Sequence, residues 1–470
     1  MSESKRLGSS PLRIALISLL ATVLLVGGVL AVQARVIKTS AEAYMFGYPL
    51  VLFDESSTTS LGFVAPKNAM YRKRTFPDSD FKGVVRPNVD TLYASSFIDL
   101  DDGPFALEMP ANNQRYALAP VLDAWGNVIL TTGTRADGGH ARRFLLVGPD
   151  WRGEVPDGLT LVRSPTRAAW LLARIQTNGE GDYPLVHGLQ DQYHVRSLAA
   201  WRAAPDRPGA GEVPTGPDPA DQPGVTPPKP AVDQVEAMPT DVFFSRLAAL
   251  MVDNPPAARD APMMRKLASL GVSPGHAPEW NWLDRQSARL GRKLADIGIA
   301  RARKQTEGAV NGWLYPPMIL GNYGVDYPVR AAVTKFGFGA NKPVDAIYPN
   351  AVIDGEGRPL EGSRTYRLHF AAGALPPVKA FWSITAYGED DFLIPNTENR
   401  YAIRDRDALA YNPDGSLDLY FGPQPPAGIA RSNWIPVTAG EKFQLTARLY
   451  WPEQAALDGR WRLPPLSKLP

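Results

Sequence analysis

The chain has 470 residues, which is long enough for two or three domains that each bury a core. Its apolar content of 44% and charged content of 21% are typical of a globular protein and exclude wholesale disorder. A net charge of +2 gives no global field that would favour nucleic acid, so no nucleic-acid partner is expected. The sequence has no cysteine, which excludes disulfides, thiolate metal sites and cysteine nucleophiles.

Residues 14–32 form an uncharged, apolar run near the N-terminus. Three basic residues precede it: Lys5, Arg6 and Arg13. The run is long enough to span a bilayer as a helix, and it exceeds the ~7–15 apolar residues usual for a signal peptide. This length favours a retained anchor, although the sequence up to Ala34 also resembles a cleavage site. We therefore expect an inner-membrane anchor with the bulk in the periplasm, or secretion to the periplasm after signal cleavage.

Residues 36–202 are predicted to form an N-terminal β module with flanking helices. Ser40 precedes an acidic first turn, which is typical of a helix start near residues 40–50. Strand-length apolar runs separated by turn signals predict that residues 84–175 are mostly β. Residues 164–176 have a helical period after Ser-Pro, which predicts a further helix.

The middle of the chain separates two β regions. Residues 203–238 include nine prolines between positions 205 and 230, and such a composition predicts an exposed loop or linker. Residues 239–320 are predicted to be a helical connector, because apolar residues such as Phe243 and Leu247 recur on one helical face.

Residues 321–465 carry the strongest pattern, a series of short aromatic and β-branched runs closed by turn signals. Two examples are VKAFWSITAYG at 378–388 and FQLTARLYWP at 443–452. Such runs are typical of antiparallel strands in a sandwich or jelly roll. The predicted fold class is mainly β with a helical connector (α+β). It comprises two jelly-roll-like antiparallel β-sandwich modules and an N-terminal hydrophobic helix within residues 1–35.

An ordered series of short strings gives the chain a resemblance to a bacterial family. The first half has RPNVDTLY from Arg86, GPDW from Gly148 and SPT from Ser164. The second half has NYG from Asn322, PPVKAFWS from Pro376 and RLYWP from Arg448. Proteins of this family pair two domains of unknown function, numbered twelve fifty-four and twelve fourteen. The resemblance implies jelly-roll-like domains with helices between them, and it implies no established activity and no catalytic residues.

Polar residues gather where a strand of the first module is predicted to begin: Arg86, Asn88, Asp90 and Tyr93. Arg86 and Asp90 are four residues apart, so in a strand they would share one face. A carboxylate held by a guanidinium group stays ionised and oriented, and it could bind hydroxyl groups or act as a base. The alternative is a buried structural pair with a turn at Asn88.

Aromatic residues beside guanidinium groups mark the C-terminal module. Flat rings next to hydrogen-bonding tips suit sugar faces and hydroxyl groups, whereas the alternative is that the same rings fill a sandwich core. We expect a ligand site at the interface of the two modules. It combines Arg86, Asn88, Asp90, Tyr93, Trp382, Arg400 and Trp434.

Two other groupings are weaker. Asp90 and His369 are candidate bases for a metal-independent hydrolase or lyase, but Ser383 lies inside a predicted strand and no GxSxG motif marks a nucleophile. A second grouping has the spacing i, i+4, i+7: His187, Asp191 and His194. That spacing alone does not indicate a metal site, so we expect no metal and no cofactor.

Three functions therefore stay open. The protein is an exported envelope protein that binds a carbohydrate or another small polar ligand between its modules, or it is a hydrolase or lyase acting on a polar substrate, or it is a purely structural envelope component. The expected partners are the membrane, through residues 14–32, and a small-molecule ligand. A second copy of the chain is a further candidate partner.

Overall fold

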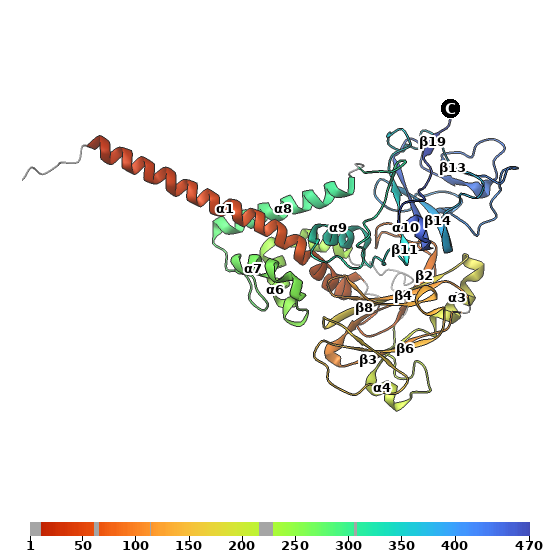
Figure 1. Cartoon of the computed structure of the whole chain (residues 1–470), viewed down its shortest axis with the longest axis horizontal. Helices are drawn as coiled ribbons and strands as arrows, with labels where there is room; N and C mark the ends of the chain where they lie inside the picture. The colour runs from red at the N-terminus through yellow and green to blue at the C-terminus, as the bar shows by residue number, and fades with distance from the viewer. Residues whose placement is uncertain (1–10, 61–64, 113, 216–228, 305–307) are drawn as a thin grey trace, which may run out of the picture.

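The computed structural model describes residues 11–60, 65–112, 114–215, 229–304 and 308–470. Lys5, Arg6 and positions 216–228 of the proline-rich segment lie outside these ranges. A long helix projects from a body that contains the sheets and the remaining helices (Figure 1). The body is mainly β with helices, so the expected fold class is confirmed.

The first sandwich has two facing sheets, ordered β1-β2-β8-β4-β5 and β7-β6-β3-β9. All of their pairings are antiparallel except β6 with β7. The strands are β1 (Tyr71–Arg72), β2 (Thr91–Asp99), β3 (Phe105–Met109), β4 (Ala117–Asp123), β5 (Val128–Gly133), β6 (Arg142–Val147), β7 (Thr160–Arg163), β8 (Ala168–Gln176) and β9 (His194–Ser197). Leu92 and Ile98 of one sheet pack against Leu107 and Phe144 of the other in a shared core.

The helix predicted at 164–176 is wrong, because residues 168–176 form β8, a central strand of the first sheet. Seven consecutive residues of β8 are buried, with one face on the sandwich core and the other under a layer of helices. A strand that is buried on both faces has a continuous apolar sequence, and periodicity cannot distinguish such a run from a buried helix.

The second sandwich also has two sheets, ordered β10-β12-β18-β14-β15, with β11 beside β18, and β17-β16-β13-β19. The strands are β10 (Trp313–Leu314), β11 (Ala346–Ile347), β12 (Asn350–Ala351), β13 (Tyr366–Phe370), β14 (Val378–Gly388), β15 (Ala402–Arg404), β16 (Leu417–Gly422), β17 (Trp434–Pro436), β18 (Phe443–Pro452) and β19 (Leu466–Lys468). Leu368 and Phe421 of one sheet meet Trp382 and Leu449 of the other in its core.

The helices of the middle region cover the outer face of the first sheet, where Phe97 and Trp170 join their core. The helices of this layer are α1 (Pro11–Glu55), α5 (Ala231–Ala237), α6 (Thr240–Asp253), α7 (Ala261–Ser269), α8 (Trp282–Lys304) and α9 (Tyr327–Gly337). The other helical segments are η1 (Ser56–Ser60), η2 (Leu100–Asp102), α2 (Thr134–Asp137), η3 (Glu180–Asp182), α3 (Tyr183–Gln190), α4 (Leu198–Ala203), η5 (Ala258–Asp260), η6 (Arg431–Asn433) and α10 (Gln454–Leu457).

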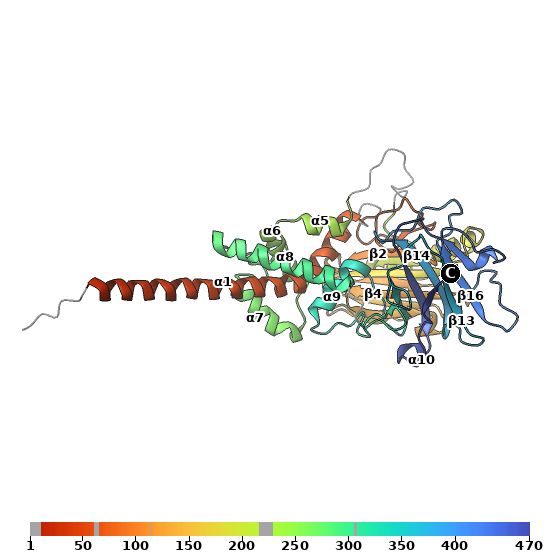
Figure 2. The same cartoon turned by 90° about the horizontal axis from the view of Figure 1, so that it is seen from above.

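Helix α1 runs without interruption from the apolar N-terminal run into this helical core (Figure 2). Its leucines and valines between Leu16 and Val32 are exposed, whereas Tyr44, Phe46 and Phe53 are fully buried or nearly so. The separate helix expected at 40–50 is therefore the inner part of α1, and Ser40 lies buried within it instead of capping its start.

Helix α8 packs along α1 through a glycine. A Cβ atom built on Gly291 would lie 2.3 Å from the carbonyl oxygen of Ile37. Gly298, further along the same helix, has nothing within 4 Å of the same position. The close approach of the two helices therefore requires glycine at 291 and not at 298.

Because Gly291 has no space for a Cβ atom and Gly298 does, alanine substitutions at these two positions test the packing of α8 on α1. Gly291→Ala is expected to lower the free energy of unfolding by about 1–3 kcal/mol, because a methyl group must push α8 away from α1. Gly298→Ala is expected to raise it by about 0.5–1 kcal/mol through helix propensity alone. Chemical denaturation of the full chain in detergent measures both values, and equal effects of the two substitutions would contradict the packing described.

Candidate functional site

The two sandwiches meet on a polar face of the second one. Strands alternate their faces, and in β14 Trp382 and Ile384 point into the second sandwich's core. Ser383 and Tyr387 on the opposite face reach the segment that precedes β2 in the first sandwich. We call this contact the seam: residues 86–91 of the first sandwich against the polar faces of β14, β15 and β18.

Asp90 lies at the centre of the seam and is fully buried. Its Oδ2 accepts a hydrogen bond from the hydroxyl group of Ser383. The strand register places Arg404 of β15 and Arg448 of β18 opposite Ser383, one on each side. Asp90 Oδ1 lies 3.4 Å from Arg404 Nε and 3.4 Å from Arg406 Nη2.

These arginines determine the charge of the buried carboxyl group. Burial by itself would raise the pKa of Asp90. The positive charges of Arg406, Arg404 and Arg448, together with the Ser383 hydrogen bond, outweigh burial and hold its pKa below the ordinary value. Asp90 is therefore an ionised carboxylate that links two modules.

Arg86 does not pair with Asp90, contrary to the expectation of a shared strand face. Strand β2 begins only at Thr91, and Arg86 has a left-handed backbone with a φ of 51°. Its guanidinium group instead reaches the second sandwich, where Nε donates to Asp391 at 3.0 Å and Nη2 donates to Gln444 at 3.0 Å. Both charged residues of the string thus find their ionic partners in the other module.

Asn88 forms the expected turn. Its Oδ1 accepts hydrogen bonds from the backbone N–H groups of Asp90 at 2.6 Å and Thr91 at 3.2 Å. Its Nδ2 donates to the hydroxyl group of Tyr450 at 2.8 Å, again across the seam. Tyr93, five residues further, is partly buried, and the guanidinium group of Arg174 lies 5.5 Å from its ring centre.

Arg448 completes the seam from β18. Its side chain is almost fully buried, and it donates to Thr385 Oγ1 at 2.8 Å and to the hydroxyl oxygen of Tyr387. Burial opposes its charge, but Tyr387, Tyr450 and Asp90 favour the charged form and raise its pKa above the ordinary value. An arginine inside the predicted strand FQLTARLYWP was the signal in the sequence that could have identified it.

The structure does not bring Trp382, Arg400 and Trp434 to the seam. Trp382 is 3% exposed and packs against Phe370 inside the second sandwich. Trp434 donates its indole N–H to the carbonyl oxygen of Gly422 at 2.9 Å, and Arg400 donates to the carbonyl oxygen of Ser432. The positively charged groups at the seam that sequence reasoning left out of the site are Arg404, Arg406 and Arg448.

The structure does not bring His369 and Ser383 together, and it does not assemble the grouping of His187, Asp191 and His194. His369 is half exposed and lies 2.8 Å from Asp418, whereas Ser383 is bonded to Asp90. His187 is in α3 and interacts with the carbonyl oxygen of Arg74, and His194 is in β9 beside Glu212. Within the described ranges, no three His, Cys, Asp or Glu side chains are arranged to hold a metal ion.

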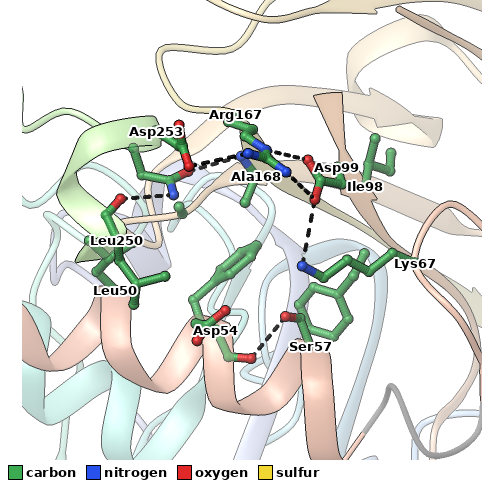
Figure 3. A pocket seen from close by; sticks show the side chains of 14 residues that line it. Leu50, Asp54, Ser57, Lys67, Ile98, Asp99, Arg167, Ala168, Leu250 and Asp253 are labelled. Atoms are coloured by element: carbon green, nitrogen blue, oxygen red, sulfur yellow. Dashed lines mark hydrogen bonds and ion pairs between the residues drawn. The ribbon is translucent and has the colours of Figure 1, made fainter. Parts of the chain in front are cut away.

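A small pocket of about 140 Å³ lies between α1, α6 and the first sheet (Figure 3). Its polar wall is internally paired: Arg167 Nε lies 2.6 Å from Asp99, Arg167 Nη1 lies 3.1 Å from Asp253, and Lys67 lies 3.6 Å from Asp99. Burial raises the pKa of Asp99, but its bonds to Arg167 outweigh this and lower it. These charges satisfy one another, so the pocket gives little reason to expect a charged ligand.

Comparison with known proteins finds one family model over each of the two sandwiches. The family model described as "Protein of unknown function (DUF1254)" matches residues 67–197, and the one described as "Protein of unknown function (DUF1214)" matches residues 345–454. The chain belongs to the family of proteins that pair these two domains, which confirms the resemblance seen in the sequence. No curated protein matches this sequence.

Two solved structures resemble the chain along most of its length. The VPA0106 protein from Vibrio parahaemolyticus is 22% identical, with a TM-score of 0.67 over 93% of this chain and 100% of that one. An uncharacterized protein from Burkholderia cenocepacia is 12% identical, with a TM-score of 0.43 over 96% of this chain and 98% of that one. The first likeness shows a shared fold and carries no information about activity.

Asp405, beside the seam, provides a test of its electrostatics. Burial raises the pKa of Asp405 from 3.8 to about 6, although Arg406 and the backbone N–H of Trp382 favour its charged form. The folded protein therefore prefers the protonated form of Asp405. The stability that protonated Asp405 contributes is fully present below pH 3.8 and is lost as the pH rises through about 6. Asp405→Asn is therefore expected to raise the free energy of unfolding relative to the native chain at pH 8, by about 1–2 kcal/mol.

The measurement is a set of denaturation curves between pH 4 and pH 8. The gain from Asp405→Asn should shrink toward pH 4, where the native carboxyl group is itself protonated. Asp150→Asn, at an exposed position, controls for the change in net charge. A gain that is constant across this pH range would show that burial does not shift Asp405.

Proposed function

We propose that the protein is anchored in the membrane by α1 and that its body binds a small polar ligand with an acidic group at the seam. The observation that carries the ligand proposal is Arg406. Its side chain is 15% exposed, and its buried Nε and Nη1 atoms have no hydrogen-bond acceptor among the described residues, with Asp405 Oδ1 at 3.7 Å from Nη1. A partly buried guanidinium group with unused donors favours an anionic or strongly accepting partner.

The surroundings of Arg406 support an acidic ligand rather than a neutral sugar. Arg404, at 19% exposure, shares the buried carboxylate of Asp90 with Arg406. Each also has a longer ion pair of 3.7 Å, Arg404 with Asp407 and Arg406 with Asp405. Neutral sugars are held largely by exposed aromatic faces, and Trp382 and Trp434 are buried. The ligand class that we propose is therefore sugar acids and other small acids with several hydroxyl groups, and it does not include neutral sugars.

The two alternatives fit this geometry less well. A general base works best with a pKa near the working pH and with access to its substrate, whereas Asp90 has a lowered pKa and no exposure. A purely structural seam explains Asp90 and Arg86 but leaves the unused donors of Arg406 without a role. The structural alternative predicts that no small acid stabilises the protein.

Thermal unfolding of the full chain in detergent tests the ligand proposal. Glucuronate, galacturonate and gluconate are expected to raise Tm, and glucose is expected not to do so. Arg406→Gln should weaken binding of the acids at least tenfold, because it removes a charge-assisted contact worth about 1.5–3 kcal/mol. Arg460→Gln, whose native side chain is 68% exposed and pairs with Asp458, is the matched control and should bind like the native chain.

Two results would overturn the proposal. Equal affinity in Arg406→Gln and the native chain would move the ligand away from the seam. The absence of any stabilisation by the acids would favour the structural alternative. Unfolding curves without ligand are recorded for every variant, so that a loss of binding is not confused with a loss of fold.

The proposal of a retained anchor rests on the continuity of α1. The helix has one window with a mean hydropathy of 2.6 that is long enough to cross a membrane and is entirely unburied. Immediately after the exposed run, Gln33 donates to Asp284 at 3.0 Å and accepts from Ser287 at 2.7 Å, both in α8. Cleavage after Ala34 would cut within the helix and remove these contacts with the body.

Expression of the full chain in a bacterium tests the anchor. The intact mass of the purified protein is expected to include residues 1–34, and the protein is expected to stay in the membrane pellet after carbonate extraction. A Leu20→Arg, Leu24→Arg double variant should lose membrane retention, because charged residues at the centre of a span are costly, by about 2.5–3.5 kcal/mol each. A mature N-terminus at Arg35 together with a soluble protein would refute the retained anchor.

A further inference from the structure

A second and larger pocket, of about 400 Å³, lies between the first sandwich and the helical layer and shares no residue with the seam. Its walls come from the turn between β4 and β5, the segment before α7, and α9. Pro165 and Thr166, of the string SPT noted in the sequence, meet Arg330 there. Trp125 and three prolines supply the apolar part of the lining: Pro165, Pro255 and Pro256.

Arg330 is the exceptional group in this pocket. It is only 2% exposed, and no carboxylate within the described residues lies close enough to form an ion pair with it. Its only side-chain hydrogen bond within these residues goes from Nη2 to the carbonyl oxygen of Phe46, at 3.3 Å. Nε has no acceptor, and Nη1 donates no hydrogen bond within the described part of the chain.

Aromatic rings hold the guanidinium group in place. It lies 5.4 Å from the ring centre of Phe46, 5.2 Å from Trp125 and 5.2 Å from Tyr327. These contacts favour a cation, but they do not replace hydrogen-bond acceptors. Burial is the largest influence on Arg330 and lowers its pKa, so its charge is incompletely compensated.

The two acidic residues that line this pocket, Asp123 and Asp260, already accept hydrogen bonds from other groups. Asp123 accepts from the backbone N–H groups of Trp125 and Asn127, both at 2.9 Å. Asp260 accepts from the backbone N–H of Ala257 at 3.1 Å and from the hydroxyl group of Tyr327 at 3.0 Å. Their charges contribute at longer range, and neither side chain gives the guanidinium group a direct partner.

We propose that this pocket binds a small carboxylic acid whose carboxylate accepts hydrogen bonds from Arg330. The volume is within the range of about 300–1,000 Å³ typical of small-ligand sites. Trp125 and the three prolines provide an apolar surface for a short carbon skeleton. A bound carboxylate would supply the acceptors that the buried guanidinium group lacks, which is a charge-assisted pairing of matched geometry.

Isothermal titration of the full chain in detergent with acetate, lactate and succinate tests this site. Acetamide, a neutral analogue of acetate, and inorganic phosphate serve as comparison ligands. At least one carboxylate is expected to bind, acetamide is expected not to bind, and Arg330→Met should weaken the carboxylate at least tenfold. Methionine keeps an apolar side chain of similar length, and without ligand its Tm should equal or exceed that of the native chain, because an unpaired buried charge is removed.

Two further variants separate loss of this site from a change in net charge and from a folding defect. Arg460→Gln, at an exposed position that pairs with Asp458, should bind these carboxylates like the native chain. Ala258→Trp, at an exposed position on the pocket wall, should block binding while leaving Arg330 intact. Unchanged affinity in Arg330→Met, tighter binding of phosphate than of every carboxylate, or no carboxylate binding by the native chain would each overturn the proposal.

Discussion

The structure depends on helix α1, a single helix of 45 residues whose two halves have different surroundings. The outer half exposes its leucines and valines, and the inner half supplies Tyr44, Phe46 and Phe53 to the core between the helices and the first sheet. Because one rigid element has both roles, the body has a fixed direction relative to the exposed apolar run. Gly291 of α8 and Arg330 of α9 both contact the backbone of α1, so this helix also positions the Arg330 pocket.

The seam joins the sandwiches by ionic and hydrogen-bonded contacts, and apolar packing lies beside them. Val89 packs with Tyr387 and Leu393, and Tyr116 packs with Phe381 and Tyr450. Desolvation of a carboxylate is unfavourable, and Asp90 remains ionised only because arginines of the second sandwich surround it. Removing a single partner would leave a buried charge uncompensated. Such a contact tolerates few relative orientations of the two modules, since each guanidinium group must meet its own acceptor. The ionic contacts of the seam therefore fix the relative orientation of the two modules.

Local sequence patterns identified some elements well and others poorly. The alternating runs of β14 and β18 predicted strands, and Asn88 predicted its turn, because both depend on neighbouring residues alone. Residues 168–176 were assigned to a helix because a strand buried on both faces lacks the alternation that identifies strands. Tryptophans such as Trp382 were assigned to a ligand site because an aromatic residue in a strand can face either side, and the sequence does not say which side meets the core.

The sequence by itself determined the class of fold, the apolar N-terminal run and the string from Arg86 to Tyr93, since composition, periodicity and short motifs act locally. Only the tertiary structure decided which charges meet. Asp90 lies more than 300 residues from Arg404 and Arg406, yet it contacts both, and Arg86 pairs with Asp391 instead of its neighbour Asp90. The partner of a charge depends on strand register and on the docking of two modules, and neither is encoded in any short stretch of chain.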